Sequence, residues 1–285
     1  MSRNLNQQVI VITGASSGIG AATAIECARA GMNVVINARR ADRLEAVAEQ
    51  VRAAGGKAET VVGDVTDQGI SDRMLDAAEQ RFDRLDAVFA NAGYGFCRPA
   101  HEVTVDQLRH IFEVDFFASV DLVNAAAKRM IARSSGGHLL MCSSCLAKFT
   151  LSGYSAYSAA KAAQNHICRA MNVELEPHRI HVSSVHPITT RTEFFSVVQG
   201  HSGRTVNTSG APGHASRFFV QSSEHVARAI VKCLRRPRPE VWTSFTTRAV
   251  AAVMTLWPGS MDLVMRKVAR ADEEKGDRSI FRRGK

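Results

Sequence analysis

The sequence predicts an α/β fold in which one doubly wound parallel sheet lies between two layers of helices. Seven short apolar runs, rich in β-branched residues, alternate with segments of helical periodicity, which is typical of parallel strands joined by crossover helices. The expected strands are residues 9–13, 34–37, 58–62, 87–90, 138–142, 181–186 and 240–243. A hydrophobic fraction of 45% in 285 residues is enough to cover such a sheet on both faces.

The first strand breaks into a glycine-rich turn, and the helical stretch 21–30 follows. Gly14 permits the tight turn, Gly18 lets the backbone approach a phosphate, and Gly20 lets the helix pack against the strand. The free N–H groups of that helix would then face a pyrophosphate. The expected cofactor contacts are Gly14, Ser16, Ser17, Gly18, Ile19 and Gly20. The spacing G-x-x-x-G-x-G differs from the commoner G-x-G-x-x-G, and a glycine-rich connection without a ligand is the alternative.

The end of the second strand bears on the choice of dinucleotide. A chain that prefers NAD usually has a carboxylate about 20 residues beyond the glycines, where it holds the ribose 2′-hydroxyl. Ala38 occupies that position, and the planar guanidinium of Arg39 suits a 2′-phosphate. NADP(H) is therefore favoured, while Asp42 keeps NAD(H) open. Alternatively, Arg39 and Arg40 form only the solvated start of the helix expected over 41–54.

The fifth strand leads to Ser144, and the segment Tyr157-Ser-Ala-Ala-Lys161 begins thirteen residues later. Residues four apart on a helix share one face, so Lys161 is expected beside Tyr157. An ammonium favours the phenolate and is expected to lower a pKa that is about 10 in isolation. The pair predicts an acid/base group that works near neutral pH, provided that the surrounding motifs support it.

In order and spacing, the glycine turn, Asn91-Ala-Gly93, Ser144, Tyr157-x-x-x-Lys161 and segment 187–192 resemble the short-chain dehydrogenase/reductase family. The resemblance covers residues 5 to about 245 and implies a Rossmann-like fold and hydride transfer between NADP(H) and a carbonyl or alcohol. By this resemblance, Tyr157 transfers the proton and Ser144 contacts the substrate oxygen. Lys161 contacts both Tyr157 and the nicotinamide ribose. The other implied cofactor contacts are Asp64, Val65, Asn91, Ala92, Gly93, Pro187 and Thr192.

Two positions depart from the family pattern, which usually has asparagine where this chain has Asp115 and glycine where it has Ile188. In the family the asparagine kinks a helix, and its backbone carbonyl holds a water that leads to the lysine. A backbone role is therefore expected to survive at Asp115, the fourth candidate catalytic residue. Its carboxylate can pair with Lys161 and weaken the lysine's effect on Tyr157. Ile188 lacks the freedom in φ of glycine, which predicts an unusual path for the next loop.

One domain is expected over residues 1–245, with segment 194–223 as a lid over the substrate and a basic extension over 246–285. Residues 228–285 hold 14 Lys/Arg and 6 Asp/Glu, a net charge of +8 in a chain of +9. Two apolar stripes at helical spacing predict two short amphipathic helices, which govern association or substrate access. They pack on the domain or on a partner subunit, or instead contact an anionic membrane. The stripes are Val250, Val253, Met254 and Trp257, then Met261, Val264, Met265 and Val268, with Arg266, Lys267 and Arg270 opposite.

Composition excludes several other classes of function. No metal site is expected, because the ten histidines include no His-x-x-x-His pair or Cys/His cluster with plausible ligand geometry, and Cys142-x-x-Cys145 overlies Ser144 at a strand end. No recognition motif supports nucleic-acid binding, and no signal peptide or apolar run of about 20 residues is recognised. The sequence therefore predicts a cytoplasmic carbonyl reductase, a homo-oligomer (dimer or tetramer), acting on apolar or lipid-like small molecules. The alternative is a nucleotide-binding regulatory or scaffold protein without turnover.

Overall fold

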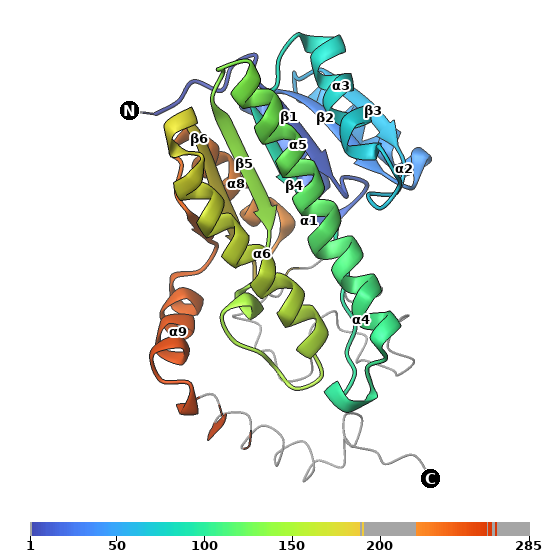
Figure 1. Ribbon diagram of the computed structural model, residues 1–285. Coiled ribbons are helices and arrows are strands. Elements are labelled where there is room, and N and C mark those ends of the chain that lie inside the picture. Colours follow the sequence, from blue (N-terminus) through green and yellow to red (C-terminus); the bar gives the residue numbers. More distant parts are fainter. Residues whose placement is uncertain (1, 189, 191–220, 261, 264–265, 267–285) are drawn as a thin grey trace.

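A seven-stranded parallel sheet forms the centre of the molecule, with strand order β3-β2-β1-β4-β5-β6-β7 (Figure 1). This computed structural model describes residues 2–188, 190, 221–260, 262–263 and 266. Each expected strand is present, and its ends differ from the expected ends by no more than one residue. The strands are β1 (Val9–Thr13), β2 (Asn33–Ala38), β3 (Ala58–Val62), β4 (Ala87–Ala90), β5 (Gly137–Cys142), β6 (Ile180–His186) and β7 (Glu240–Trp242).

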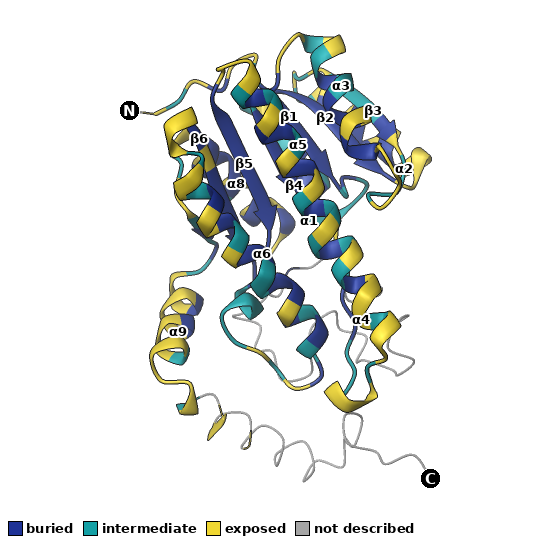
Figure 2. Ribbon diagram, in the orientation of Figure 1, coloured by how far each residue is buried: buried dark blue, intermediate teal, exposed yellow. Residues whose placement is uncertain are grey.

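Helices cover both faces of the sheet and make three layers. One face carries α1 (Gly18–Arg29), α2 (Ala41–Ala53) and α8 (Ser223–Arg235); the other carries α3 (Ile70–Phe82), α5 (Ala118–Ala132) and α6 (Ser155–Glu174). Alternation along β1 sends Ile10 and Ile12 into the first layer and Val9 and Val11 into the second. Most strand residues are accordingly buried, those of the edge strand β3 less fully, and the helices show their exposed sides outward (Figure 2). The predicted doubly wound α/β fold is confirmed.

The strand order reverses between β1 and β4, because β1 pairs with both β2 and β4. In open parallel sheets, ligands bind at the carboxyl ends of the strands beside such a reversal. The glycine turn follows β1, Asn91 follows β4, and Ser144 lies just beyond β5. The topology therefore brings three separate sequence motifs to one edge of the sheet.

A π-helical turn over Glu113–Phe117 joins α4 (Val105–Phe112) to α5. Thr104 begins α4 through a capping box with Gln107, which fixes the start of this long helical segment. A π turn leaves a backbone carbonyl without its usual helical partner. That irregularity falls at Asp115, where the family pattern predicts a kink.

The chain beyond β7 forms α9 (Phe245–Leu256), which Ser244 caps by accepting a hydrogen bond from the Thr247 N–H at 3.2 Å. The first of the two predicted amphipathic helices therefore exists. Most of its predicted stripe does not pack on the domain: Val250, Val253 and Trp257 are exposed and Met254 is half-buried, whereas Thr247 and Ala251 are buried. Residues 194–220 of the expected lid and the second apolar stripe lie outside the described residues. No helix in the described part of the chain is long and apolar enough to cross a membrane.

Candidate active site

The turn between β1 and α1 has the geometry of an anion-binding loop. Gly14 has a φ of +64°, and a Cβ on it would lie 2.9 Å from the Ala92 Cα. A Cβ on Gly20 would lie 2.5 Å from the carbonyl oxygen of Gly14, so only glycine permits this contact between turn and helix. Ser17, at the N-cap of α1, makes no side-chain capping bond, and the first turn contains no acidic residue. The N–H groups at the start of α1 are therefore available to an anion.

Asn91 ties the end of β4 to this turn. Its Nδ2 donates to the Thr13 carbonyl at 2.9 Å, while the Thr13 Oγ1 accepts from the backbone N–H groups of Asn91 at 2.9 Å and Ala92 at 3.0 Å. Val65, Thr13 and Ala92 line one small pocket. Gly93 lies close to the next group of residues, since a Cβ on it would approach the Asp115 Oδ2 to 3.1 Å.

Two arginines frame the glycine turn on the side of β2. The Arg39 guanidinium pairs with Asp64, with 3.3 Å between Nη1 and Oδ2. Arg40 reaches the turn itself, where its Nη2 donates to the Ser16 Oγ at 3.1 Å and the Ser17 Oγ at 3.2 Å. Arg40 was not among the predicted site residues, although its place after Arg39 is visible in the sequence. The guanidinium groups of Arg39 and Arg40 thus place positive charge beside the glycine turn.

Ser144, Tyr157 and Lys161 come together as predicted. Ser144 is the N-cap of the 3-10 turn η3 (Cys145–Ala147), and its Oγ accepts from the Leu146 N–H at 3.1 Å. A hydroxyl that accepts such a bond still has its own O–H to donate to another oxygen. The Tyr157 side chain hydrogen-bonds Ser144, and the Lys161 Nζ lies 5.6 Å from the centre of the Tyr157 ring.

Asp115 and Lys161 form a buried ion pair, as the sequence analysis anticipated. The Lys161 Nζ lies 3.0 Å from the Asp115 Oδ2 and donates to the Cys142 carbonyl at 2.9 Å. The Tyr94 N–H donates to the Asp115 Oδ1 at 2.9 Å. Asp115 has no exposed surface and Lys161 only 3%, so water screens their attraction weakly. Burial raises the pKa of Asp115, and Lys161 opposes that rise.

The backbone carbonyl of Asp115 accepts hydrogen bonds from two side chains, whereas the family pattern predicts a bound water there. Gln164 Nε2 and Ser119 Oγ both donate to it, the latter at 3.0 Å. A carbonyl oxygen has two lone pairs, so side chains hold the position where the family pattern predicts a water. Gln164 was missed by the sequence analysis. Its spacing of three residues from Lys161 and seven from Tyr157 places all three on one face of α6, and that spacing was the available clue.

The expected lowering of the Tyr157 pKa is wrong. Burial raises the pKa of Tyr157 well above its usual value, the Asp115 carboxylate raises it further, and the hydrogen bond with Ser144 only partly opposes them. The main physical reason is burial of the phenol, and the second is the ion pair, because Asp115 offsets the charge with which Lys161 would favour the phenolate. Tyr157 therefore keeps its proton at neutral pH.

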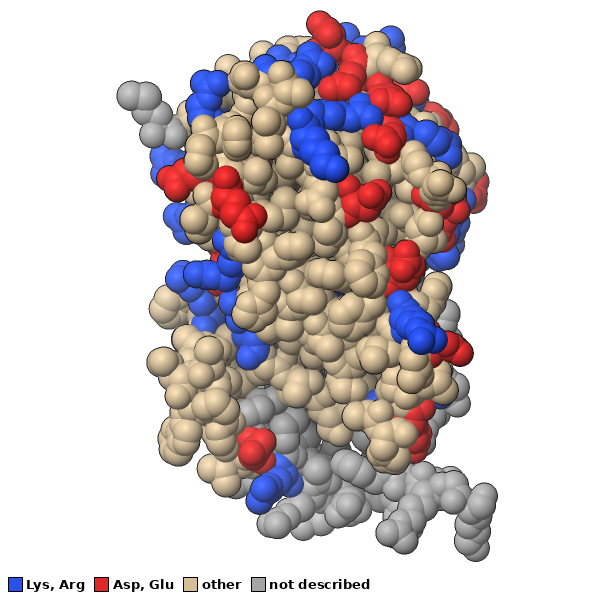
Figure 3. Space-filling view, viewed as in Figure 1, with Lys and Arg blue, Asp and Glu red and all other residues tan. Residues whose placement is uncertain are grey.

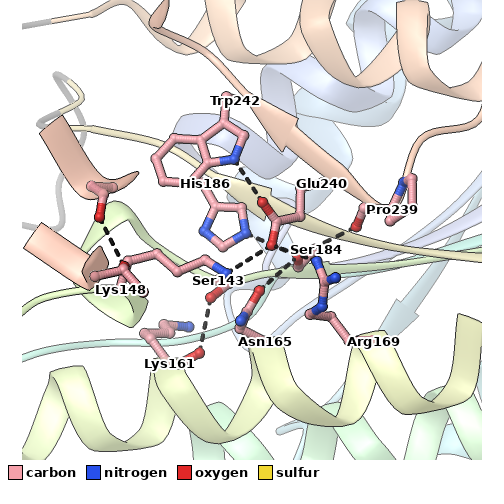
Figure 4. A network of polar contacts seen from close by, with 12 residues as sticks. Ser143, Lys148, Lys161, Asn165, Arg169, Ser184, His186, Pro239, Glu240 and Trp242 are labelled. Carbon is pink, nitrogen blue, oxygen red and sulfur yellow. Dashed lines mark hydrogen bonds and ion pairs between the residues drawn. The ribbon is translucent and has the colours of Figure 1, made fainter. Parts of the chain in front are cut away.

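A partly buried network of polar contacts around His186 and Glu240 (Figure 4) is joined to the Ser144 backbone. The His186 Nδ1 lies 2.8 Å from the Ser144 carbonyl, and its ring stacks on Trp242 with 4.6 Å between centroids. Burial lowers the pKa of His186 to about 4, so the ring is neutral at pH 7. Because a carbonyl oxygen can only accept, the proton is on Nδ1, which donates the hydrogen bond to the Ser144 carbonyl. Glu240 accepts from Trp242 Nε1 at 2.9 Å and Lys148 Nζ at 2.7 Å. No motif in the sequence predicted this network.

The loop after β6 starts without strain. The Pro187 carbonyl accepts from the Cys145 N–H at 3.1 Å, which attaches the loop to the turn after Ser144. Ile188 is buried and is not among the residues with positive φ, so the distortion expected from the missing glycine does not occur at this residue. Thr192 lies outside the described residues.

Comparison with known proteins agrees with this geometry. Residues 8–203 match the sequence model of the family described as short chain dehydrogenase. The chain belongs to this family of oxidoreductases. It is 34% identical over 194 residues to an uncharacterized oxidoreductase of Mycobacterium tuberculosis, covering 68% of this chain and 73% of that protein. It is also 29% identical over 267 residues to 1-deoxy-11-beta-hydroxypentalenate dehydrogenase of Streptomyces exfoliatus. That match covers 90% of this chain and 96% of the Streptomyces protein. The crystal structure of a short chain dehydrogenase/reductase from Burkholderia phymatum in complex with NAD has a TM-score of 0.79 at 20% identity, covering 88% and 94%.

The cysteines beside the site of this short-chain dehydrogenase are free thiols. Burial raises the pKa of both Cys142 and Cys145 to about 11, so both are protonated at neutral pH. Protonated thiols are weak nucleophiles and poor metal ligands. Within the described residues, no three His, Cys, Asp or Glu side chains converge as metal ligands.

Proposed function

We propose that the protein is an NADP(H)-dependent oxidoreductase that reduces a carbonyl compound, or oxidises the corresponding alcohol, with Tyr157 as the general acid/base. The observation that carries this proposal is the meeting of Ser144, Tyr157 and Lys161 at the sheet edge that also holds the glycine turn. The turn fits a dinucleotide, because its glycines let the backbone come close and α1 offers free N–H groups.

The side chains beyond β2 support NADP(H). Ala38 supplies no carboxylate for a ribose 2′-hydroxyl, and Arg39 and Arg40 supply two guanidinium groups beside the turn. Arg39 is 78% exposed, so its pairing with Asp64 is weak and leaves it able to bind a phosphate. NAD(H) is the alternative, since the Burkholderia relative was solved with NAD.

The dinucleotide would supply the hydride. In reduction, the Tyr157 hydroxyl gives its proton to the substrate oxygen as negative charge develops there, and the Ser144 O–H donates a hydrogen bond to the same oxygen. Lys161 would contact the nicotinamide ribose while Asp115 and the Cys142 carbonyl fix its ammonium. His186 acts through Ser144, whose backbone it holds. Because these side chains are already held in place, the reacting groups lose less entropy on reaching the transition state.

We expect the substrate to be apolar or lipid-like. The sequence of segment 194–219 contains Phe194, Phe195, Val197, Val198, Phe218 and Phe219, all outside the described residues. The Streptomyces relative is named as a dehydrogenase of a hydroxylated compound, which fits the same chemistry. A non-catalytic nucleotide-binding protein of the same fold is the second candidate, favoured by the aspartate at position 115.

A screen of ketones and aldehydes of increasing apolarity, monitored by NADPH oxidation, tests the proposed activity. We expect turnover of at least one apolar carbonyl compound, and slower turnover with NADH. Calorimetry of NADPH binding to the same preparation supplies the control. Tight NADPH binding without turnover of any carbonyl or alcohol would favour the non-catalytic candidate.

Asp115→Asn should keep activity and shift its pH dependence. The neutral amide removes a charge that raises the Tyr157 pKa, so that pKa should move down. Reduction needs the phenol and oxidation needs the phenolate. The alkaline decline of reduction and the alkaline rise of oxidation should therefore both move to lower pH. Rate profiles of kcat/KM in both directions measure this shift.

Asp121→Asn, an exposed change on α5, is the matched control and should leave both profiles in place. A folded Asp115→Asn protein without activity would show that the carboxylate takes part in the reaction. An unchanged profile would show that Asp115 has no influence on Tyr157.

A further inference from the structure

Helix α9 presents an apolar face to solvent. At about 100° per residue, its exposed large apolar side chains fall within an arc of roughly 140°, opposite the buried Thr247 and Ala251, and the half-buried Met254 lies between the two sides. The exposed fractions are 83% for Phe245, 54% for Val253, 87% for Leu256 and 66% for Trp257. A helix with its apolar side directed away from its own domain requires another environment to cover that side.

Charge indicates which environment this is. Helix α9 contains no acidic residue, and its one charged side chain, Arg248, lies beside the apolar arc. On the face drawn in Figure 3, the surface over α9 is accordingly mostly uncharged. In the sequence that follows, residues 261–285 hold eight Lys/Arg and five Asp/Glu. An apolar arc with tryptophan at its end and basic residues after it is suited to the boundary between anionic headgroups and acyl chains.

We propose that α9 docks the protein on an anionic lipid surface, with Phe245, Val253, Leu256 and Trp257 entering the headgroup boundary. A second copy of the chain fits this face less well. Two copies that met through α9 would bring together two basic C-terminal regions of a chain whose net charge is +9. An anionic bilayer supplies both the apolar cover and the opposite charge.

Docking would place the catalytic turn near the lipid. Helix α9 packs against η3, the turn that begins at Ser144. An apolar substrate dissolved in the bilayer could then reach Ser144 without crossing water. This consequence rests on the proposed function, whereas lipid docking itself does not.

Tryptophan fluorescence tests the docking directly, because the chain has only two tryptophans. Trp242 is partly buried and stacked on His186, while Trp257 is exposed. Vesicles of phosphatidylcholine with phosphatidylglycerol should shift the emission to the blue, and lipids brominated on the acyl chains should quench it. Trp257→Phe should abolish both changes, and vesicles of phosphatidylcholine alone should produce much less. Quenching that persists in Trp257→Phe, or its absence in the unsubstituted chain, would overturn the proposal.

Co-sedimentation of the full chain with the same vesicles gives a second test that needs no enzyme activity. Val253→Glu should weaken binding by roughly tenfold or more, because a charge would enter the apolar boundary. Val173→Glu is the matched control, since Val173 is an exposed valine on α6, and it should bind like the unsubstituted chain. High salt should weaken binding by screening the basic residues. Equal binding by both variants would overturn the proposal, and so would a dimer in light scattering that only Val253→Glu disrupts.

Discussion

Tyr157→Phe should lower turnover by about 10²–10⁴, the usual contribution of general acid catalysis, while folding and NADPH binding stay nearly intact. The substitution removes only the hydroxyl and keeps the ring that packs beside Ala156 and Phe96. The loss should be as large at pH 7 as at lower pH, because the raised pKa of Tyr157 keeps the proton in place throughout that range. Steady-state kinetics with saturating cofactor measure the loss, and calorimetry measures NADPH binding.

Tyr154→Phe is the matched control, because Tyr154 lies one turn earlier at the N-cap of α6. Burial raises the pKa of Tyr154 to about 12, so its hydroxyl is also protonated at neutral pH. If proximity of any tyrosine were sufficient, the two variants would lose similar activity. We expect Tyr154→Phe to retain most of the turnover. A Tyr157→Phe enzyme that turned over at the normal rate would remove Tyr157 from the proposed mechanism.

The sheet could be predicted because its central strands β1, β2, β4 and β5 are buried on both faces and read as short, nearly continuous apolar runs. Parallel strands also need crossover helices, so the alternation alone limits the topology. Which side of α9 faces the domain could not be predicted in this way. Its periodicity showed that one face is apolar, but the burial of Thr247 and Ala251 depends on contacts with β7 and η3, which come from distant parts of the chain or from the connection into the helix.

The site was predictable to the extent that it depends on local spacing. Tyr157 and Lys161 share a helix face, so their proximity follows from four residues of sequence. The Tyr157 pKa depends on Asp115, which is 42 residues away in sequence and meets Lys161 only in the fold. His186 holds Ser144 across the same number of residues, between β5 and β6. Long-range contacts of this kind leave no periodicity in the sequence.

Arg39→Ala should weaken NADPH binding by about 1.5–3 kcal/mol, the usual contribution of a charge-assisted hydrogen bond, and should change NADH binding little. This loss corresponds to roughly 10–150-fold in Kd. The neighbouring Arg40 should behave differently. Because Arg40 donates to both Ser16 and Ser17, it also shapes the glycine turn, so Arg40→Ala should weaken both cofactors. Calorimetry with NADPH and NADH on each variant separates the two roles.

Arg52→Ala is the control for charge alone, since it removes a cation from the last turn of α2, about three turns from Arg40, where Arg52 pairs with Glu45. It should leave both cofactors unaffected, because an exposed charge at that distance is screened by salt. Equal losses of NADPH and NADH in Arg39→Ala would show that this side chain supports the fold through Asp64 and does not recognise the 2′-phosphate. A loss confined to NADPH would place the 2′-phosphate against Arg39, because only that group differs between the two dinucleotides.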